Sequence, residues 1–449
     1  MEPKGLPVTL GTQSIRHLLF EYALPAIIAM TASSLYNITD SIFIGHGVGA
    51  LAISGLAITF PLMNLAAAFG SLVGVGAATL MSVRLGQKDY HSANFILGNV
   101  FVLNLILGSL YAIIALCFLD PILYFFGASP QTLPYAHDYM QILLYGNVVT
   151  HMYLGLNALL RSIGSPQKAM YATLFTVVIN VILNPFFIFV LHLGIKGTAM
   201  ATVISQVSML IWQLKLFSNK ENFIHFQKGI FRLKRKIVFD SFSIGMAPFL
   251  MNASSCIIVI LLNQSLVHYG GDLAVGAYGI VNRIAFLFIM TVIGLNQGMQ
   301  PIAGYNFGAG QFKRVNEVLK QTIIYATIVM SIGFLAAELI PSAIASVFTS
   351  DPELIALAIP GLRLVLLLYP IDGFQMVTSN FFQSIGMAGK AIFLSLSRQV
   401  LFLLPFLLLF PHFWGINGIW MSIPAADLLS SVISAIMLRQ QYRKFKIQS

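Results

Sequence analysis

Charged side chains are scarce in this sequence: they make up 9% of its 449 residues, whereas 57% are hydrophobic. Soluble domains carry roughly a quarter charged residues, so an ordinary soluble fold is excluded. Cysteine is equally scarce. Cys117 and Cys256 both lie in apolar runs, which excludes a disulfide framework and favours two small buried hydrophobic residues. A chain of this composition is expected to place its apolar surface against lipid.

Signatures of catalysis are missing as well. The sequence contains no metal-ligand cluster, no nucleophile motif and no phosphate-binding loop. We therefore expect neither an enzyme nor a chain with a bound cofactor. The small ions that remain to be considered are H⁺ and Na⁺, as coupling ions of a transport process.

Long apolar runs are what the sequence has instead. An uncharged run such as 97–119 exceeds the roughly 20 helical residues that cross a hydrocarbon core of about 30 Å. Some runs are longer and contain proline, such as Pro61, which indicates tilted or kinked helices rather than extra crossings. Twelve helical spans are expected, at residues 17–44, 50–82, 93–119, 136–160, 170–192, 197–217, 239–267, 273–305, 320–348, 355–384, 391–411 and 415–438.

Basic residues are distributed unevenly along the chain. Most of the 25 Lys and Arg residues, from Lys4 to the dense stretch between Lys215 and Lys236 and on to the C-terminus, fall in alternate loops. The other loops carry Lys196. The positive-inside rule assigns the basic loops and both termini to the cytoplasmic side of the membrane, which we expect to be a bacterial inner membrane. This distribution accounts for the formal charge of +10 without a nucleic-acid partner.

The two halves of the chain resemble each other at a fixed offset of 222 residues. Gly76 aligns with Gly298, and residues 162–164 (SIG) align with 384–386 (SIG), at that offset. Near Gly194 the offset becomes 221. The repeat predicts an all-α polytopic membrane protein built from two related six-helix bundles, with lobes at residues 1–217 and 239–449 joined by a cytoplasmic linker at 218–238. Parallel repeats of this kind place substrate between the halves, which indicates a transporter.

Ionisable residues inside a membrane span are functional candidates, because burying a charge there is costly. Asp40 is the strongest candidate, because it lies within 36–41 (YNITDS), a polar cluster in an otherwise apolar helix. A carboxyl group kept out of water can hold a proton at neutral pH and release it to water or a cation. Pro25 lacks the backbone N–H of an ordinary helical residue, which allows this helix to bend or fixes a static kink. Glu21, Asp138 and Glu338 are interpreted as interfacial anchors.

Further polar candidates lie in both halves. Asp372 follows Pro370 in the tenth span and is expected in a cavity of the second lobe. Asp427 either lines that cavity or binds a neighbouring helix. Asn180 and Asn184 share one helix face, and with Asp40 and Thr202 they offer the oxygen ligands of a sodium ion, although interhelical hydrogen bonding is the simpler interpretation.

Several motifs resemble the multidrug and toxic compound extrusion (MATE) family. Residues 35–45 (LYNITDSIFIG) and 49–55 (GALAISG) resemble its first helix and first outer loop. Residues 305–310 (YNFGAG) resemble an inner-loop signature, and 160–164 (LRSIG) and 382–386 (FQSIG) resemble the motifs that end helices 4 and 10. The resemblance extends over essentially the whole chain. It implies twelve helices in two lobes around a central cleft.

The resemblance also implies roles for particular residues. In the DinF-like branch of the family, an aspartate of helix 1 acts with polar residues that fall here on Tyr139, Asn180, Asn184 and Thr202. Asn184 departs from that branch, which has a second carboxylate at its position, and this favours protons over sodium. The NorM-like branch uses acids of helices 7 and 10. Its helix 10 acid falls on Asp372, whereas the region of its helix 7 acid holds Asn252 and Ser255, as the sequence shows.

Two functions are therefore expected to compete. The favoured one is a monomeric exporter of drugs and toxic compounds, often organic cations, that exchanges them for protons or sodium by rocker-switch alternating access. The alternative is a flippase for lipid-linked oligosaccharides of the same superfamily. A flippase cavity would offer Arg or Lys to a diphosphate, whereas Arg283, Arg363 and Arg398 are interpreted as lying near helix ends.

Overall fold

A computed structural model describes residues 8–448, without the side chains of residues 37, 50, 272, 447 and 448. Lys4, which the charge pattern places on the cytoplasmic side, lies outside the described residues. Within residues 8–448 the regular elements are helices, and no strand occurs. The all-α fold class is confirmed.

The first half of the chain runs back and forth in long helices. In order, these are α1 (Thr9–Thr12), α2 (Ile15–Gly47), α3 (Ala50–Gly86), α4 (Tyr90–Cys117), α5 (Leu119–Phe125), α6 (Leu133–Tyr145), α7 (Asn147–Ser162), α8 (Pro166–Pro185), the π-helical η1 (Phe186–Val190) and α9 (Ile195–Ser218).

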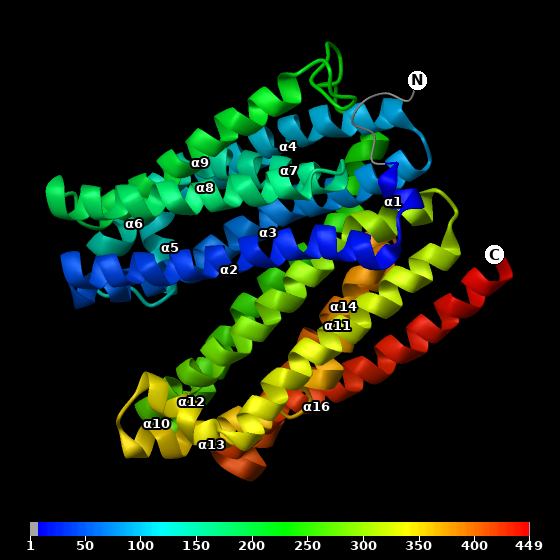
Figure 1. The fold of residues 1–449 in the computed structure, drawn as a ribbon. Coiled ribbons are helices and arrows are strands. Elements are labelled where there is room, and N and C mark those ends of the chain that lie inside the picture. The colour runs from blue at the N-terminus through cyan, green and yellow to red at the C-terminus, as the bar shows by residue number, and fades with distance from the viewer. Residues whose placement is uncertain (1–7, 449) are drawn as a thin grey trace.

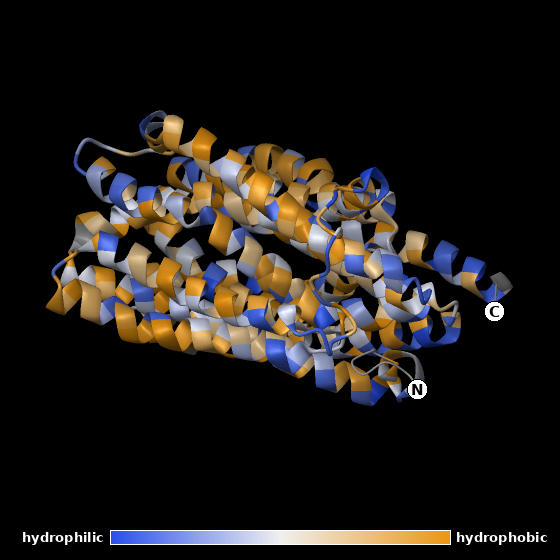
Figure 2. Cartoon of the chain, turned by 90° about the horizontal axis from the view of Figure 1, so that it is seen from above, coloured by the Kyte–Doolittle hydropathy of each residue, from blue (hydrophilic) through white to orange (hydrophobic). Residues whose placement is uncertain are grey.

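The second half repeats this pattern. Its helices are α10 (Arg235–Gly308), α11 (Phe312–Leu339), α12 (Pro341–Phe348), α13 (Pro352–Leu366), α14 (Tyr369–Ser384), α15 (Ala388–Leu396), the π-helical η2 (Ser397–Leu403) and α16 (Leu404–Gln448). Hydrophobic residues predominate in the middle of the helices, and hydrophilic ones gather toward their ends (Figure 2).

Nine helices of the described chain are long and apolar enough to cross a membrane, and a tenth crossing arises when α13 and α14, bent by 50°, form one span. Two interruptions explain the remaining crossings of the expected twelve. The last candidate span, Ala388–Lys446, turns at Gly415, whose φ of 54° is costly for residues with a side chain. Helices α6 and α7 are separated at Gly146, and each is too short to be counted alone.

Several helix boundaries differ from the sequence-based expectation, and α11 and α10 show the reasons. Helix α11 begins at Phe312 rather than 320 and ends at Leu339, because Pro341 starts the separate short helix α12. Helix α10 begins at Arg235, inside the expected linker, since a helix supplies its own backbone hydrogen bonds and continues past the membrane surface. It turns at Gly271, where φ is 66°.

The two six-helix bundles lie side by side and separate along their length (Figure 1). The first-half helices, blue to green, approach the second-half helices, yellow to red, at the end that carries both chain termini, and diverge toward the other end. We call the first of these the basic end, because Lys and Arg residues gather in the segment 219–234 and in or beside the loops 87–89, 163–165, 309–311 and 385–387 there. Helix α2 runs along the junction between the bundles.

Close contacts join the bundles near the basic end. A Cβ atom added at Gly86 of α3 would collide with the carbonyl oxygen of Tyr305 in α10, and one at Gly308 would collide with that of Val83. The side chain of Gln300 crosses from α10 to donate a hydrogen bond to Thr79 Oγ1 at 2.8 Å. The fold therefore closes the junction of the bundles at the basic end.

Candidate functional site

Asp40 of α2 is buried, with 5% of its surface exposed, and receives hydrogen bonds from the facing helix α8. The amide nitrogen of Asn184 lies 2.6 Å from Asp40 Oδ1. With its amide oriented to satisfy all partners, Asn180 donates to the same oxygen at 3.1 Å. Tyr36, one turn before Asp40, contributes a third hydrogen bond. The carboxylate is thus held by uncharged donors.

The oxygens of both amides point to helix α9. Asn184 Oδ1 accepts a hydrogen bond from Thr198 at 2.9 Å. The Asn180 oxygen accepts from Thr202 Oγ1 at 3.2 Å, and Thr202 in turn lies 2.8 Å from the Tyr36 hydroxyl. We call this network of three helices the Asp40 cluster, defined by Tyr36, Asp40, Asn180, Asn184, Thr198 and Thr202.

Local sequence explains how the helices present these groups. Each of the three helices contributes two polar residues at a spacing of four, which places both on one face. Helix α8 ends directly after Asn184, at Pro185, where the chain continues into the π-helical η1. Proline cannot donate to the preceding turn, and the helical pattern changes there.

The other predicted first-lobe residues take different places. Tyr139 of α6 is buried, and it interacts electrostatically with Asp40 without a hydrogen bond to it within the described chain. Pro25 lies inside the unbroken helix α2. A Cβ atom added at Gly298 of α10 would lie 2.6 Å from the Cα atom of Ala23, so the second half packs against α2 directly beside Pro25.

In the second half, two predicted acids meet around an arginine. Arg398 Nε of η2 lies 2.7 Å from Asp427 Oδ1 in α16 and 3.4 Å from Asp372 Oδ1 in α14. Asp372 is 0% and Asp427 is 1% exposed. Neither oxygen of Asp372 has a hydrogen-bond partner among residues 8–448. The expectation that Arg398 lies near a helix end is corrected: it lies within the last apolar span and pairs with both acids.

We call Arg398, Asp372 and Asp427 the ion cluster. Asn252 and Ser255 do not belong to it. Ser255 accepts a hydrogen bond from Gln399 Nε2 at 3.0 Å, and the Asn252 carbonyl accepts from Cys256 Sγ at 3.4 Å. Within residues 8–448, no hydrogen bond or ion pair links either residue to Asp372. Groups of three or more His, Cys, Asp or Glu side chains able to hold a metal ion are also missing from the described part of the chain.

The two polar clusters occupy non-equivalent positions of the repeat. The repeat offsets carry Asp372 and Asp427 back to Thr150 and Gln206, which hydrogen-bond to each other in the first lobe. The same offsets carry every residue of the Asp40 cluster onto an apolar residue of the second lobe. Asp40 falls on Leu262, and the others fall on Ile258, Phe402, Phe406, Ile419 and Ile423. The two halves therefore share their helical framework, but their buried acids lie at non-equivalent positions of the repeat.

Three residues that take part in these polar clusters were not among the predicted site residues. Tyr36 and Thr198 each lie four residues before a predicted site residue, Asp40 and Thr202, so helical periodicity could have identified them. Arg398 has no such signal, because its two acids come from helices distant in sequence.

Comparison with known proteins now defines the family. The sequence matches the MatE family over residues 25–186 and 244–408, which is most of the chain. This chain belongs to the MatE family. The two matched segments correspond to the two halves of the repeat, and the matched family confirms the MATE resemblance of the motifs.

Relatives of this MatE protein are similar over nearly their full length. Multidrug export protein MepA of Staphylococcus haemolyticus is 27% identical over 425 residues, covering 95% of this chain and 93% of the relative. MepA of Staphylococcus aureus is 26% identical, covering 94% and 92%.

Solved structures agree with the fold. A structure described as the outward-facing conformation of a multidrug resistance MATE family transporter superposes with a TM-score of 0.93 at 25% identity, covering 99% of both chains. A structure of MATE in the straight conformation gives a TM-score of 0.90 at 25% identity, covering 99% of this chain and 100% of the other. The fold is therefore that of the MATE transporters.

Proposed function

We propose that this MatE protein exports drug-like organic compounds, often cations, in exchange for protons. Its membership of a transporter family and the names of its relatives support multidrug export. The observation that carries the proton coupling is the setting of Asp40, which is buried and which no Lys, Arg or His side chain of the described residues pairs with. A carboxyl group in such a setting changes its charge by gaining or losing a proton.

The amide orientations in the Asp40 cluster favour a proton over sodium. A sodium ion prefers oxygen ligands that converge on it. Here the nitrogens of Asn180 and Asn184 face the carboxylate, while their oxygens are engaged with Thr202 and Thr198. A sodium ion beside Asp40 would need both amides to turn and to break those contacts.

Protonation of Asp40 would weaken the bonds between α2 and α8. A charged carboxylate accepts strong hydrogen bonds from the two amides, whereas a protonated one accepts weaker bonds and also has an O–H to place. Helix α2 carries Pro25 between Asp40 and the basic end, so a change at Asp40 is transmitted to a helix that is already missing one backbone bond. Rocking of the two lobes then exposes the cleft to alternate sides.

The second lobe contributes to substrate selection in this proposal. Asp372 and Asp427 exceed the charge of Arg398 by one negative unit, which suits an organic cation or a proton. The same pairing argues against the flippase alternative, because Arg398 is already neutralised by carboxylates. We further propose the inner-membrane location, the cytoplasmic termini, a monomeric state and the division into lobes at 218–238.

The test is efflux of a fluorescent organic cation from everted membrane vesicles, energised either by a pH gradient or by a sodium gradient. We expect the native protein to respond to the pH gradient, and Asp40→Asn to lose that response. Asp138→Asn is the matched control, because it changes the same atoms in an exposed pair with Lys196, 3.3 Å away. Native rates in Asp40→Asn under both gradients would overturn the coupling role.

A companion variant tests the second lobe. Asp372→Asn should alter the ranking of cationic substrates while the response to the pH gradient persists. Identical transport of every cation tested would remove Asp372 from the substrate site and leave the coupling role of Asp40 untouched.

A further inference from the structure

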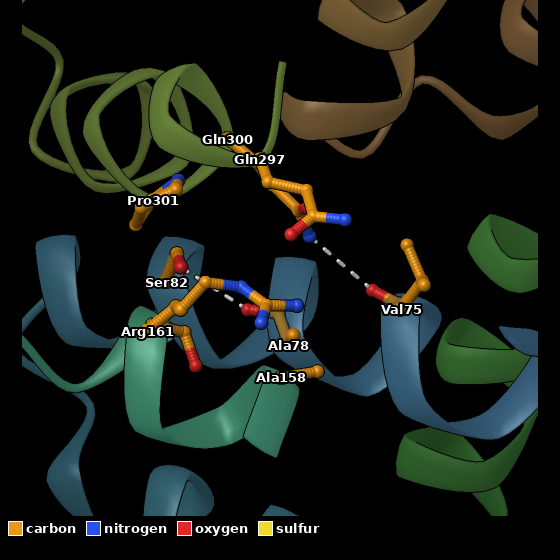
Figure 3. Close-up of a pocket in the computed structure, with 9 residues that line it drawn as sticks. Val75, Ala78, Ser82, Ala158, Arg161, Gln297, Gln300 and Pro301 are labelled. Atoms are coloured by element: carbon orange, nitrogen blue, oxygen red, sulfur yellow. Dashed lines mark hydrogen bonds between the residues drawn. The ribbon is translucent and has the colours of Figure 1, made fainter. Parts of the chain in front are cut away.

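A small cavity lies between the two halves near the basic end, where α3, α7 and α10 meet (Figure 3). Its volume is about 10 Å³, close to the smallest that holds one water molecule. Arg161 of α7 lines this cavity together with Val75 and Ala78 of α3 and Gln297 and Gln300 of α10. A drug-sized molecule is too large for it.

The cavity lies where α3 and α10, equivalent helices of the two halves, face each other. The repeat offset of 222 carries Val75 to Gln297 and Ala78 to Gln300, so equivalent positions of the two halves face each other across it. A small cation that crossed the closed junction between α3 and α10 at this level would pass this cavity. The identity of its one charged lining residue therefore matters for leakage.

Arg161 differs from other arginines that approach the protein interior. Arg84 and Arg398 each have a carboxylate within 4 Å, at 3.7 and 2.7 Å. Arg161 has neither an ion pair nor a hydrogen bond among the residues that the structure describes. A guanidinium stays protonated in proteins, so the cavity carries an uncompensated positive charge.

The neighbouring polar groups do not form an anion site around this charge. Ser82 donates to the Ala78 carbonyl at 3.1 Å, and Ser162 donates to that of Leu159 at 2.9 Å. Gln300 is engaged with Thr79. Gln297 Oε1, which has no hydrogen-bond partner within residues 8–448, is an acceptor and would repel an anion.

We propose that Arg161 is a charge barrier that keeps cations from leaking through the closed basic end while the cleft faces the opposite side. A fixed positive charge in a narrow site of low dielectric repels protons and alkali cations strongly. The equivalent residue of the second half is Gln383, so the second half adds no such charge. The inference deepens the proposed antiport, because an exporter that leaks cations dissipates the gradient that drives it.

The test is cation leak through purified protein in proteoliposomes, without any substrate. A potassium diffusion potential, negative inside, drives proton entry, which an enclosed pH dye reports; rubidium uptake is measured in parallel. We expect Arg161→Gln, which copies the second half, to raise the leak about tenfold, the rate effect of a barrier lower by ~1.4 kcal/mol. Arg161→Lys keeps the charge and should remain as tight as the native protein.

Two further variants separate charge from packing. Lys168→Gln removes an exposed positive charge in the first turn of the next helix, α8, and should not leak. Gln297→Glu keeps Arg161 but places a carboxylate in the same cavity, so it should leak cations as Arg161→Gln does. This variant tests the role of the charge even if Arg161→Gln does not fold. Native tightness in folded Arg161→Gln or in Gln297→Glu, or equal leak in Arg161→Lys and Arg161→Gln, would overturn the barrier.

Because leak is measured without substrate, its outcome is independent of Asp40. A proton-coupling failure in the Asp40→Asn experiment leaves the leak comparison intact, and a tight Arg161→Gln leaves the coupling role of Asp40 intact.

Discussion

Asn184 donates a 2.6 Å hydrogen bond to Asp40, at the position where the DinF-like branch of the family has a second carboxylate. An amide there supplies a donor, whereas a carboxylate would supply a second negative charge at the same distance. The two residues therefore share one charge and one hydrogen bond, which is the basis of the proton coupling that we propose.

Placing a carboxylate at residue 184 should change the coupling ion. In Asn184→Asp, two carboxylates about one hydrogen bond apart must share a proton or bind a cation, because both cannot remain charged and alone. We expect sodium-driven efflux from everted vesicles to rise several-fold over the native level. Asn219→Asp, which adds a carboxylate at an exposed position, is the control. Equal sodium dependence in Asn184→Asp and native protein would contradict the balance described here.

The first-lobe site could be predicted further than the second because its evidence is local. Asp40 interrupts an apolar helix, and Asn180 and Asn184 share a face by spacing alone. The charge pattern and the repeat likewise predict the crossings and their order. The site signals lie within one helix each, and the charge pattern and the repeat can be read directly along the chain.

The interruptions and the ion cluster depend on contacts between helices. The expected span 136–160 divides at Gly146, where an added Cβ atom would lie 2.5 Å from Val203 of α9. Arg398 meets its two acids only after α14, η2 and α16 have packed together. A lone arginine in sequence carries no signal of such partners, so its position was interpreted wrongly.

Substitution of Arg398 should destabilise the protein more than substitution of either acid that it pairs with. Arg398→Gln leaves two buried carboxylates without a cation, and breaking a buried pair in this way costs about 3–5 kcal/mol. We expect a large drop in the melting temperature of the detergent-solubilised protein. The double variant Arg398→Gln with Asp427→Asn should recover part of the loss, because fewer charges remain unpaired.

An exposed ion pair serves as the comparison for the stability loss in Arg398→Gln. Arg363 lies 3.9 Å from Glu338 with half of its side chain exposed, so Arg363→Gln should cost at most about 1 kcal/mol. Equal melting shifts in Arg398→Gln and Arg363→Gln would show that the buried cluster does not stabilise the second lobe.

Two polar contacts across the basic end should differ in strength. Gln300→Leu leaves Thr79, which is fully buried, without its partner, at a cost of about 1–3 kcal/mol. Asp240→Asn weakens a partly exposed contact with Arg84 at 3.7 Å, worth about 0–1 kcal/mol and screened by salt. Melting measured at low and high salt distinguishes them. A larger, salt-sensitive loss in Asp240→Asn would reverse this ranking.

Two glycines of α10 should respond in opposite directions to substitution by alanine, because Gly298 packs against α2 beside Pro25 and Gly279 does not. In Gly298→Ala the new Cβ atom would lie 2.6 Å from the Cα atom of Ala23, so α2 or α10 must shift, at about 1–3 kcal/mol. Gly279→Ala meets nothing within 4 Å and should stabilise the helix by about 0.5–1 kcal/mol. Melting and efflux should both fall in Gly298→Ala alone. Stabilisation by both variants would mean that α2 is free to move away from α10, and that bending at Pro25 is not restrained by this contact.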